Sequence, residues 1–130
     1  MRILLDTQIA IWALTDTKRL SERARKLIGD DANDVFVSAV SVWEIAIKFA
    51  LAKRTAAPPF SGTVAREAFR AAGYRMLNVT PEHAAGLDGL PPSHADPFDR
   101  MLISQALLEP LRLLTADKAL AGYGAMVIVA

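Results

Sequence analysis

Cysteine is absent from this chain of 130 residues, and histidine is scarce. The absence of cysteine excludes disulfide bonds, thiolate metal sites and cysteine nucleophiles. No uncharged hydrophobic run reaches the roughly 20 residues that a helix needs to cross a bilayer. The first residues also lack the basic segment and small-residue cleavage site of a secretion signal. We therefore expect a soluble, cytoplasmic protein with no membrane contact.

An excess of charge of one sign is also missing, because 15 basic and 14 acidic side chains leave a net charge of +1. This balance neither favours nor excludes nucleic-acid binding, since a local patch can act without a global excess. The chain has no Gly-x-x-x-x-Gly-Lys-Ser/Thr phosphate loop and no Gly-x-Ser-x-Gly elbow. P-loop and serine-hydrolase chemistry are therefore disfavoured.

Hydrophobic residues are plentiful, at 52% of the chain, which predicts one domain over residues 1–130. Short strand-like runs alternate with longer segments of helical periodicity. This alternation predicts an α/β fold with a central, mostly parallel β-sheet and helices on both faces. Strands are expected at 3–5, 35–37, 76–79, 111–114 and 126–128. Helices are expected at 21–28, 40–53, 64–72 and 97–108, with shorter ones after Asp6, after Thr80 and near Lys118, and a loop at 86–95.

Four acidic residues fall near one predicted edge of this sheet. Asp6 and Asp117 follow strands, whereas Glu44 and Asp99 lie in the first turns of helices. Helix N-termini share an edge with the carboxyl ends of parallel strands, where such sheets bind ligands. Crowded carboxylates repel one another, and a hard divalent cation such as Mg²⁺ or Mn²⁺ removes that repulsion. Such an ion can activate water and neutralise phosphate charge, so the pattern indicates phosphodiester hydrolysis.

Each acid also fits a purely structural role. Asp6 and Asp117 follow strands, where aspartate commonly caps a helix or a turn. Glu44 stands three residues after Ser41, as in a capping box, and four before Lys48, as in a surface ion pair. Taken singly, the acids do not choose between the two roles. Their convergence on one edge favours the functional role.

Residues 96–106 closely resemble a segment of PIN-domain ribonucleases, in particular the VapC toxins of VapBC toxin–antitoxin pairs. Their sequence is Asp-Pro-Phe-Asp-Arg-Met-Leu-Ile-Ser-Gln-Ala. Residues 4–7, 38–48 and 113–117 are similar to the family's other acidic motifs, so the resemblance covers nearly the whole chain. Its main departure, Ser104 where the family often has alanine, does not touch the acids.

The resemblance implies a PIN-like fold and a metal-dependent endoribonuclease, the toxin of a type II toxin–antitoxin system. It assigns catalysis and the binding of Mg²⁺ or Mn²⁺ to Asp6, Glu44, Asp99 and Asp117. Asp96 fits better as a helix cap than as a metal ligand, because aspartate before proline is a common cap. The expected substrate-binding residues are Thr7, Arg100 and Thr115.

The resemblance also implies partners and products. They are an RNA substrate cut to 5′-phosphate and 3′-hydroxyl ends, a cognate VapB-like antitoxin and a second copy of the chain in a homodimer. The antitoxin would cover or disturb the acidic site. Our hypothesis for its contact is an exposed apolar groove formed by the helices around Trp12 and Trp43.

Two rival functions stay open. A phosphatase could form an aspartyl-phosphate at Asp6, but Gln8 stands where such enzymes normally carry a second aspartate. A catalytically silent PIN-like binding module would keep the fold without the reaction. Metal-dependent RNA cleavage separates these hypotheses. Lys48, Arg100 and Lys118 could contact substrate phosphates or could be surface charges. Arg100 could instead pair with Asp96 or Asp99. We expect structural roles for His83 and His94.

Overall fold

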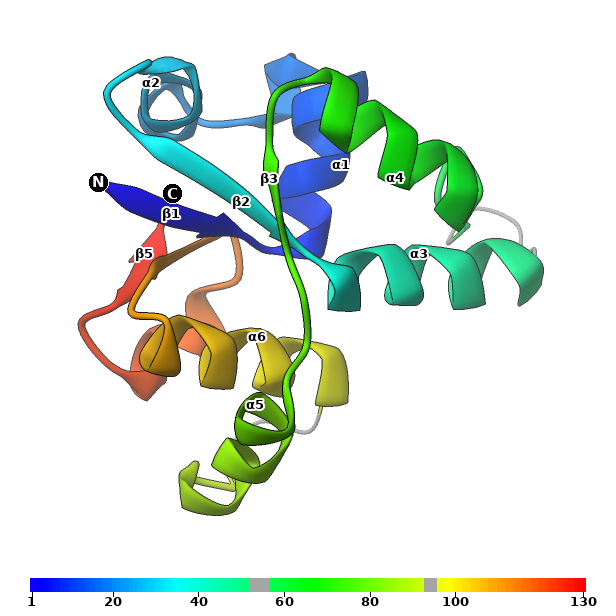
Figure 1. The fold of residues 1–130 in the computed structure, drawn as a ribbon. Coiled ribbons are helices and arrows are strands. Elements are labelled where there is room, and N and C mark those ends of the chain that lie inside the picture. Colours follow the sequence, from blue (N-terminus) through cyan, green and yellow to red (C-terminus); the bar gives the residue numbers. More distant parts are fainter. Residues whose placement is uncertain (52–56, 93–95) are drawn as a thin grey trace.

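Five parallel strands form one sheet in the order β3-β2-β1-β4-β5. The structure is a computed structural model that describes residues 1–51, 57–92 and 96–130. The chain adds β2 and β3 on one side of β1 and then returns to add β4 and β5 on the other side, so its winding reverses between β1 and β4 (Figure 1). Ligands of α/β sheets bind at such a reversal. The strands are β1 (Arg2–Leu5), β2 (Asp34–Ser38), β3 (Arg75–Leu77), β4 (Arg112–Thr115) and β5 (Val127–Val129).

Helices cover both faces of the sheet, as the sequence predicts. Figure 1 shows α1, α2 and α4 on one face and α5 and α6 on the other, while α3 extends away from the end of β2. The α-helices are α1 (Thr7–Thr15), α2 (Glu22–Gly29), α3 (Ala39–Leu51), α4 (Gly62–Ala71), α5 (Pro81–Ala85) and α6 (Pro97–Leu108). Short 3₁₀ helices are η1 (Thr17–Arg19), η3 (Gly86–Gly89) and η4 (Lys118–Tyr123). Within the described part of the chain, no helix is both long and apolar enough to span a membrane.

Successive side chains of β1 point to opposite faces and seed two hydrophobic cores. Ile3 and Leu5 pack in a cluster with Phe69 and other residues of α1, α2 and α4. Leu4 packs on the other face with Leu102 and neighbouring residues of α6. All three strand residues are fully buried, which is why this strand is a continuous apolar run rather than an alternating one. The central strand is thereby held rigidly, and its carboxyl end is a firm base for a site.

The predicted helix starts are largely confirmed by their caps. Ser21 Oγ accepts the Ala24 N–H at the start of α2. Thr80 caps α5 with Pro81 at the first helical position. The predicted loop at 86–95 is wrong in its first part, because residues 86–89 form η3. Residues 93–95, which include His94, and the predicted end of a helix at Lys53 lie outside the described residues.

Ser41 and Glu44 do not form a capping box, the structural alternative considered for Glu44. Helix α3 begins at Ala39, directly after β2, so Ser41 already lies inside the helix. Ser38 Oγ instead accepts the Val40 N–H at 3.0 Å. In this helix both Ser41 and Glu44 are buried. Glu44 is therefore an interior carboxylate rather than a helix-capping side chain at the surface.

Candidate active site

Asp6 lies where the winding of the sheet reverses. It follows Leu5, which pairs with Val37 of β2 and Leu114 of β4, and the Asp6 N–H donates to Leu114 O at 3.0 Å. One carboxylate oxygen, Oδ1, accepts the Ile9 N–H at 2.8 Å and caps α1. The other, Oδ2, accepts a hydrogen bond from Thr115 Oγ1 across the reversal. Asp6 therefore caps α1, as its structural interpretation predicts. It also lies at the edge of the sheet where ligands bind, as its functional interpretation requires.

The charge of Asp6 is poorly compensated by the protein. Burial raises the pKa of its carboxyl from 3.8 to about 6, because the charged form loses its hydration. Hydrogen bonds from Thr115 and Ile9 oppose this rise in pKa, whereas the negative charges of Asp99 and Glu44 add to it. These three acids, which are distant in sequence, are therefore close enough to repel one another. The hydrogen bonds described for the Asp6 carboxylate come from a neutral hydroxyl and a backbone N–H rather than from a cation.

Glu44 is the second buried acid of this edge. Like Asp6 it is 7% exposed, and it projects from the second turn of α3. Its Oε2 lies 2.5 Å from Lys48 Nζ, one turn later on the same helix. The predicted ion pair is therefore present, but its carboxylate is interior and only its ammonium is accessible. Beside Glu44, Ser41 Oγ accepts a hydrogen bond from Thr7 Oγ1 at 2.9 Å, which ties α3 to the start of α1.

Asp96 and Asp99 share the N-terminus of α6 but do different things. Asp96 Oδ1 accepts the N–H groups of Phe98 and Asp99, at 2.8 and 3.2 Å, as the predicted helix cap. Asp99 lies one turn inside, half-buried, and its charge reaches Asp6. The positive end of the helix dipole favours an anion at either place. The geometry thus supports Asp96 as the capping residue and Asp99 as the acid of the site.

Asp117 stands at the rim, exposed and just beyond β4. Its Oδ1 accepts the Ala119 N–H at 2.9 Å and caps η4. Its own N–H donates to Thr115 Oγ1 at 3.0 Å. Since the Thr115 hydroxyl also donates to Asp6, one buried threonine connects the backbone of Asp117 to the carboxylate of Asp6. Thr115 is thus a positioning residue between the two acids, and no spacing in the sequence reveals that bridge.

The acidic side chains are of the type that binds a hard divalent cation, but in the described part of the chain they do not lie close enough together to form a metal site. Among residues 1–51, 57–92 and 96–130, no three histidine or carboxylate side chains are grouped closely enough to hold a metal ion. Asp6, Glu44 and Asp117 are each engaged by a donor from the protein itself. The candidate donors are all oxygens, the ligands that hard divalent cations prefer, and burial with nearby negative charge raises the pKa of Asp6. By residue type the site therefore fits a hard divalent cation such as Mg²⁺ or Mn²⁺.

A profile described as the PIN domain matches residues 3–125, which is more than half of the chain. The chain belongs to the PIN-domain family. Ribonuclease VapC22 of Mycobacterium tuberculosis is 30% identical to this PIN domain over 122 residues, which are 93% of the chain and 91% of the relative. The PIN-domain resemblance expected from the acidic motifs is confirmed.

Solved structures share the fold of this PIN domain. VapBC2 from Rickettsia felis, bound to a DNA fragment from its promoter, matches with a TM-score of 0.69 and 14% identity, over 100% of this chain and 98% of that chain. A toxin–antitoxin complex from Klebsiella pneumoniae matches with a TM-score of 0.66 and 17% identity, over 98% and 96% of the two chains. At these identities the likeness concerns the fold. The predicted PIN-like α/β architecture is confirmed, with every paired strand parallel among the described residues.

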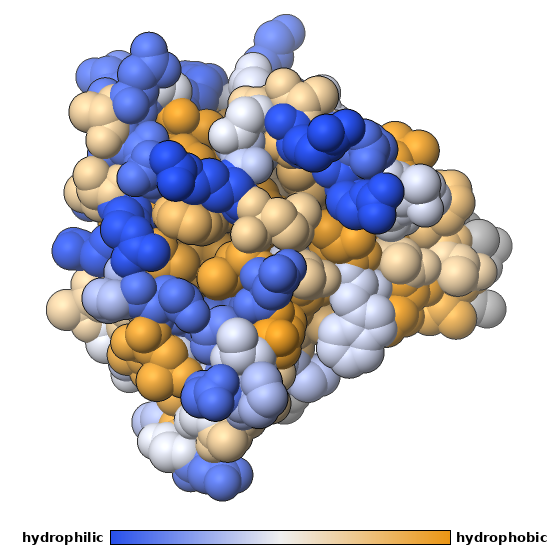
Figure 2. All heavy atoms as spheres, in the orientation of Figure 1, coloured by the Kyte–Doolittle hydropathy of each residue, from blue (hydrophilic) through white to orange (hydrophobic). Residues whose placement is uncertain are grey.

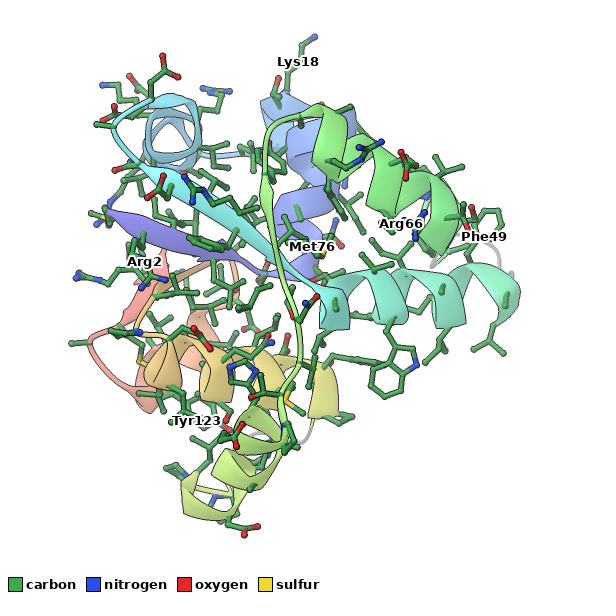
Figure 3. The ribbon with its side chains drawn as sticks, in the orientation of Figure 1. Arg2, Lys18, Phe49, Arg66, Met76 and Tyr123 are labelled. Carbon is green, nitrogen blue, oxygen red and sulfur yellow. The ribbon has the colours of Figure 1, made fainter. Side chains whose placement is uncertain are left out.

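Two hollows of this PIN domain flank α3. The α1–α3 hollow has a volume of about 420 Å³ and is lined by Thr7, Trp12, Glu44 and Lys48, among others. The α3–α4 hollow, of about 650 Å³, is lined on α3 by Trp43. Phe49, Arg66 and Met76, which are labelled in Figure 3, also line the α3–α4 hollow. The hypothesis of one groove shared by Trp12 and Trp43 is therefore wrong, because the two tryptophans line different sides of α3.

The predicted substrate-binding residues have distinct surroundings. Thr7 is buried between Asp6 and Ser41 and contributes to the wall of the α1–α3 hollow. Arg100 is half-buried on α6, where Nη1 donates to Pro91 O at 2.6 Å and to Tyr123 Oη at 3.0 Å. These two contacts hold the Arg100 side chain to neighbouring segments. The structure thus brings Thr7 and Thr115 to the acids and gives Arg100 a tethering role as well.

Proposed function

We propose that this PIN domain is a metal-dependent endoribonuclease of the VapC type, the toxin of a toxin–antitoxin pair, formed as a single domain over residues 1–130. The observation that carries the proposal is the buried carboxylate of Asp6 at the reversal point of the sheet, which lies near enough to Glu44 and Asp99 for their charges to raise its pKa. The likeness to Ribonuclease VapC22 supports RNA as the substrate. Gln8, at the place where an aspartyl-phosphate phosphatase carries a second aspartate, weighs against the phosphatase alternative.

In the proposed mechanism, Asp6, Glu44 and Asp99 would hold one or two Mg²⁺ or Mn²⁺ ions, with Asp117 as a direct or indirect fourth carboxylate. When bound, the ions supply the charge that activates water and neutralises the scissile phosphate. Thr115 orients Asp6 through its hydroxyl, and Ser41 keeps Thr7 at the mouth of the site. The α1–α3 hollow opens directly beside Glu44 and is the place proposed for the RNA next to the cleaved bond.

A cognate antitoxin, a homodimer and a cytoplasmic location complete the proposal. The structural neighbours include toxin–antitoxin complexes, which supports an antitoxin as partner. Hydrophobic residues gather over the region of α3 on the face shown in Figure 2. Exposed apolar side chains of α3 include Ile47, Phe49 and Leu51. Exposed apolar surface of this kind is typical of protein contacts. It supports a protein partner on α3 without choosing between antitoxin and second copy.

The decisive experiment compares the wild type with Asp6→Asn on a panel of RNAs, with and without Mg²⁺ or Mn²⁺. We expect the wild type to cleave only with metal and Asp6→Asn to lose about 10³-fold or more in rate, since a metal ligand is removed. Chelation should stop the wild type. Equal cleavage by both proteins would refute the role of Asp6. A wild type that hydrolyses only phosphomonoesters would indicate the phosphatase, and an inert one the binding module.

A further inference from the structure

Lys48 puts a positive charge directly on a buried acid of the proposed site. Its Nζ lies 2.5 Å from Glu44 Oε2, and the two side chains differ sharply in exposure, at 47% for Lys48 and 10% for Glu44. The ammonium also lies 6.0 Å from the centre of the Phe98 ring, close enough for a weak cation–π attraction. The pair therefore spans the boundary between the interior and the α1–α3 hollow, with its anion inside.

The contrast with Asp6 shows what this ammonium does. Both carboxylates are buried in the same acidic region, yet the groups that contact them differ. Asp6 accepts hydrogen bonds from a neutral hydroxyl and a backbone N–H, whereas Glu44 has a full cation. A buried carboxylate without a counter-charge is costly, and the Lys48 ammonium supplies that counter-charge to Glu44. A divalent cation bound to the same carboxylate would meet this ammonium at short range.

We propose that Lys48 is an internal counter-ion of Glu44 that competes with the divalent cation for this carboxylate and so sets the metal affinity of the site. This inference rests on the proposed function, because it takes Glu44 to be a metal ligand. Metal binding separates the pair, and the α1–α3 hollow, which Lys48 lines, leaves room for its flexible stem to turn away. Lys48 thereby lowers the metal affinity of the site and stabilises the folded protein when no metal is bound.

Helix α2 offers a matched control for this pair. Lys26 and Glu22 have the same spacing of four residues and lie 3.4 Å apart, but both are about three-quarters exposed, at 77% and 76%. None of the candidate ligands is on α2. Replacing Lys26 by methionine removes the same charge from the same kind of pair. Such an exposed ion pair contributes little to stability.

The test measures Mn²⁺ binding by calorimetry at fixed pH and ionic strength for the wild type, Lys48→Met, Lys48→Arg and Lys26→Met. We expect Lys48→Met to bind Mn²⁺ about fivefold or more tightly, because one repelling charge is removed at close range. Lys48→Arg keeps the charge and should stay near the wild type. Lys26→Met should stay within about twofold, since exposed charges farther away are screened.

A second readout is the melting temperature in chelator and in Mn²⁺. Lys48→Met should melt below the wild type in chelator, because Glu44 loses its counter-ion, and should gain more than the wild type when Mn²⁺ is added. A lysine with a merely structural role would lower both melting temperatures equally. Lys48→Gln serves as a second neutral variant if circular dichroism shows that Lys48→Met is unfolded.

Unchanged or weaker Mn²⁺ binding by the folded neutral variants would overturn the proposal. Asp6→Asn distinguishes this outcome from a failure of the proposed function. If Asp6→Asn loses Mn²⁺ binding while Lys48→Met binds like the wild type, the metal site stands and the role of Lys48 is wrong. If the wild type itself binds no Mn²⁺, the proposed site and the role of Lys48 fall together.

Discussion

At the carboxyl edge of the sheet, carboxylates of like charge gather around Asp6, whereas between α5 and α6 a buried histidine is enclosed by partners of matching chemistry. His83 is 1% exposed, and its Nδ1 accepts the Thr80 N–H at 3.0 Å. Because Nδ1 is an acceptor there, Nε2 carries the proton and donates to Glu109 Oε2 at 2.6 Å. The His83 carbonyl oxygen accepts from Ser104 Oγ at 2.6 Å.

The difference between the two regions separates a structural polar cluster from a functional one. Around His83 nearly every polar atom has its complement, and only Gln105 Oε1 is a buried side-chain atom without a partner in the part of the chain that is described. Satisfied groups of this kind hold α5 on α6. Around Asp6 the burial of charge is not balanced, and this imbalance is typical of sites that await a ligand. The expected structural role of His83 agrees with this geometry.

The largest expected effect compares two aspartates on one helix. Asp99→Asn should lower metal-dependent RNA cleavage by about 10²-fold or more, because it removes a proposed ligand. Asp96→Asn should change it by less than about threefold, since asparagine caps helices as well as aspartate does. Steady-state cleavage rates at saturating Mn²⁺ measure both. A larger loss with Asp96→Asn than with Asp99→Asn would reverse their assigned roles.

In the histidine cluster, the effect should fall on stability instead. His83→Ala removes a buried ring with its hydrogen bonds and leaves Glu109 unpaired, so we expect about 2 to 4 kcal/mol less free energy of unfolding in urea. Cleavage per folded molecule, measured well below the melting temperature, should be nearly unchanged. Glu109→Gln keeps an acceptor for Nε2 and should cost about 1 kcal/mol. A selective loss of cleavage in folded His83→Ala would break the division between the two regions.

At the acidic edge, a substitution should raise the free energy of unfolding, whereas His83→Ala lowers it. Asp6→Asn should raise the free energy of unfolding in chelator by about 1 to 3 kcal/mol at pH 7.5, because it removes a buried charge. The pKa of Asp6 rises from 3.8 to about 6 on folding, so the folded protein binds more protons between these values. This contribution to wild-type stability is fully present below pH 3.8 and is lost as the pH rises through 6. The gain from Asp6→Asn should therefore vanish near pH 4, and a gain independent of pH would contradict its cause.

The smallest expected effect tests how tightly the histidine cluster is packed. A Cβ on Gly86 would fall well inside van der Waals contact of Ser104 Oγ, the donor to His83. Gly86→Ala should cost about 1 to 2 kcal/mol in urea unfolding. Gly89, at the end of the same 3₁₀ helix, has open space at this position, so Gly89→Ala should stay within about 0.5 kcal/mol. Equal effects of the two substitutions would show that the cluster yields easily.

Much of the fold follows from local sequence signals. Apolar runs of strand length predict all five strands to within a residue or two, because buried parallel strands are hydrophobic on both faces. Ser21, Thr80 and Asp96 are predicted as caps, since short polar side chains satisfy free N–H groups at a helix start. The sequence signal for a helix is weak at residues 86–89, where glycines favour a loop, so η3 is missed. It is misleading at Ser41, whose capping motif lies inside a helix that starts earlier.

The sequence by itself determined that Asp6, Glu44, Asp99 and Asp117 stand after strands or in the first turns of helices, positions that share one edge of a parallel sheet. Only the tertiary structure decided which partner each acid has. Thr115 meets Asp6 because β1 and β4 are neighbours, and Glu44 is interior because α3 packs beside α1. The separation of Trp12 from Trp43 likewise depends on how α3 lies between two hollows. Contacts between distant segments arise from the packing of whole elements, which no local pattern encodes.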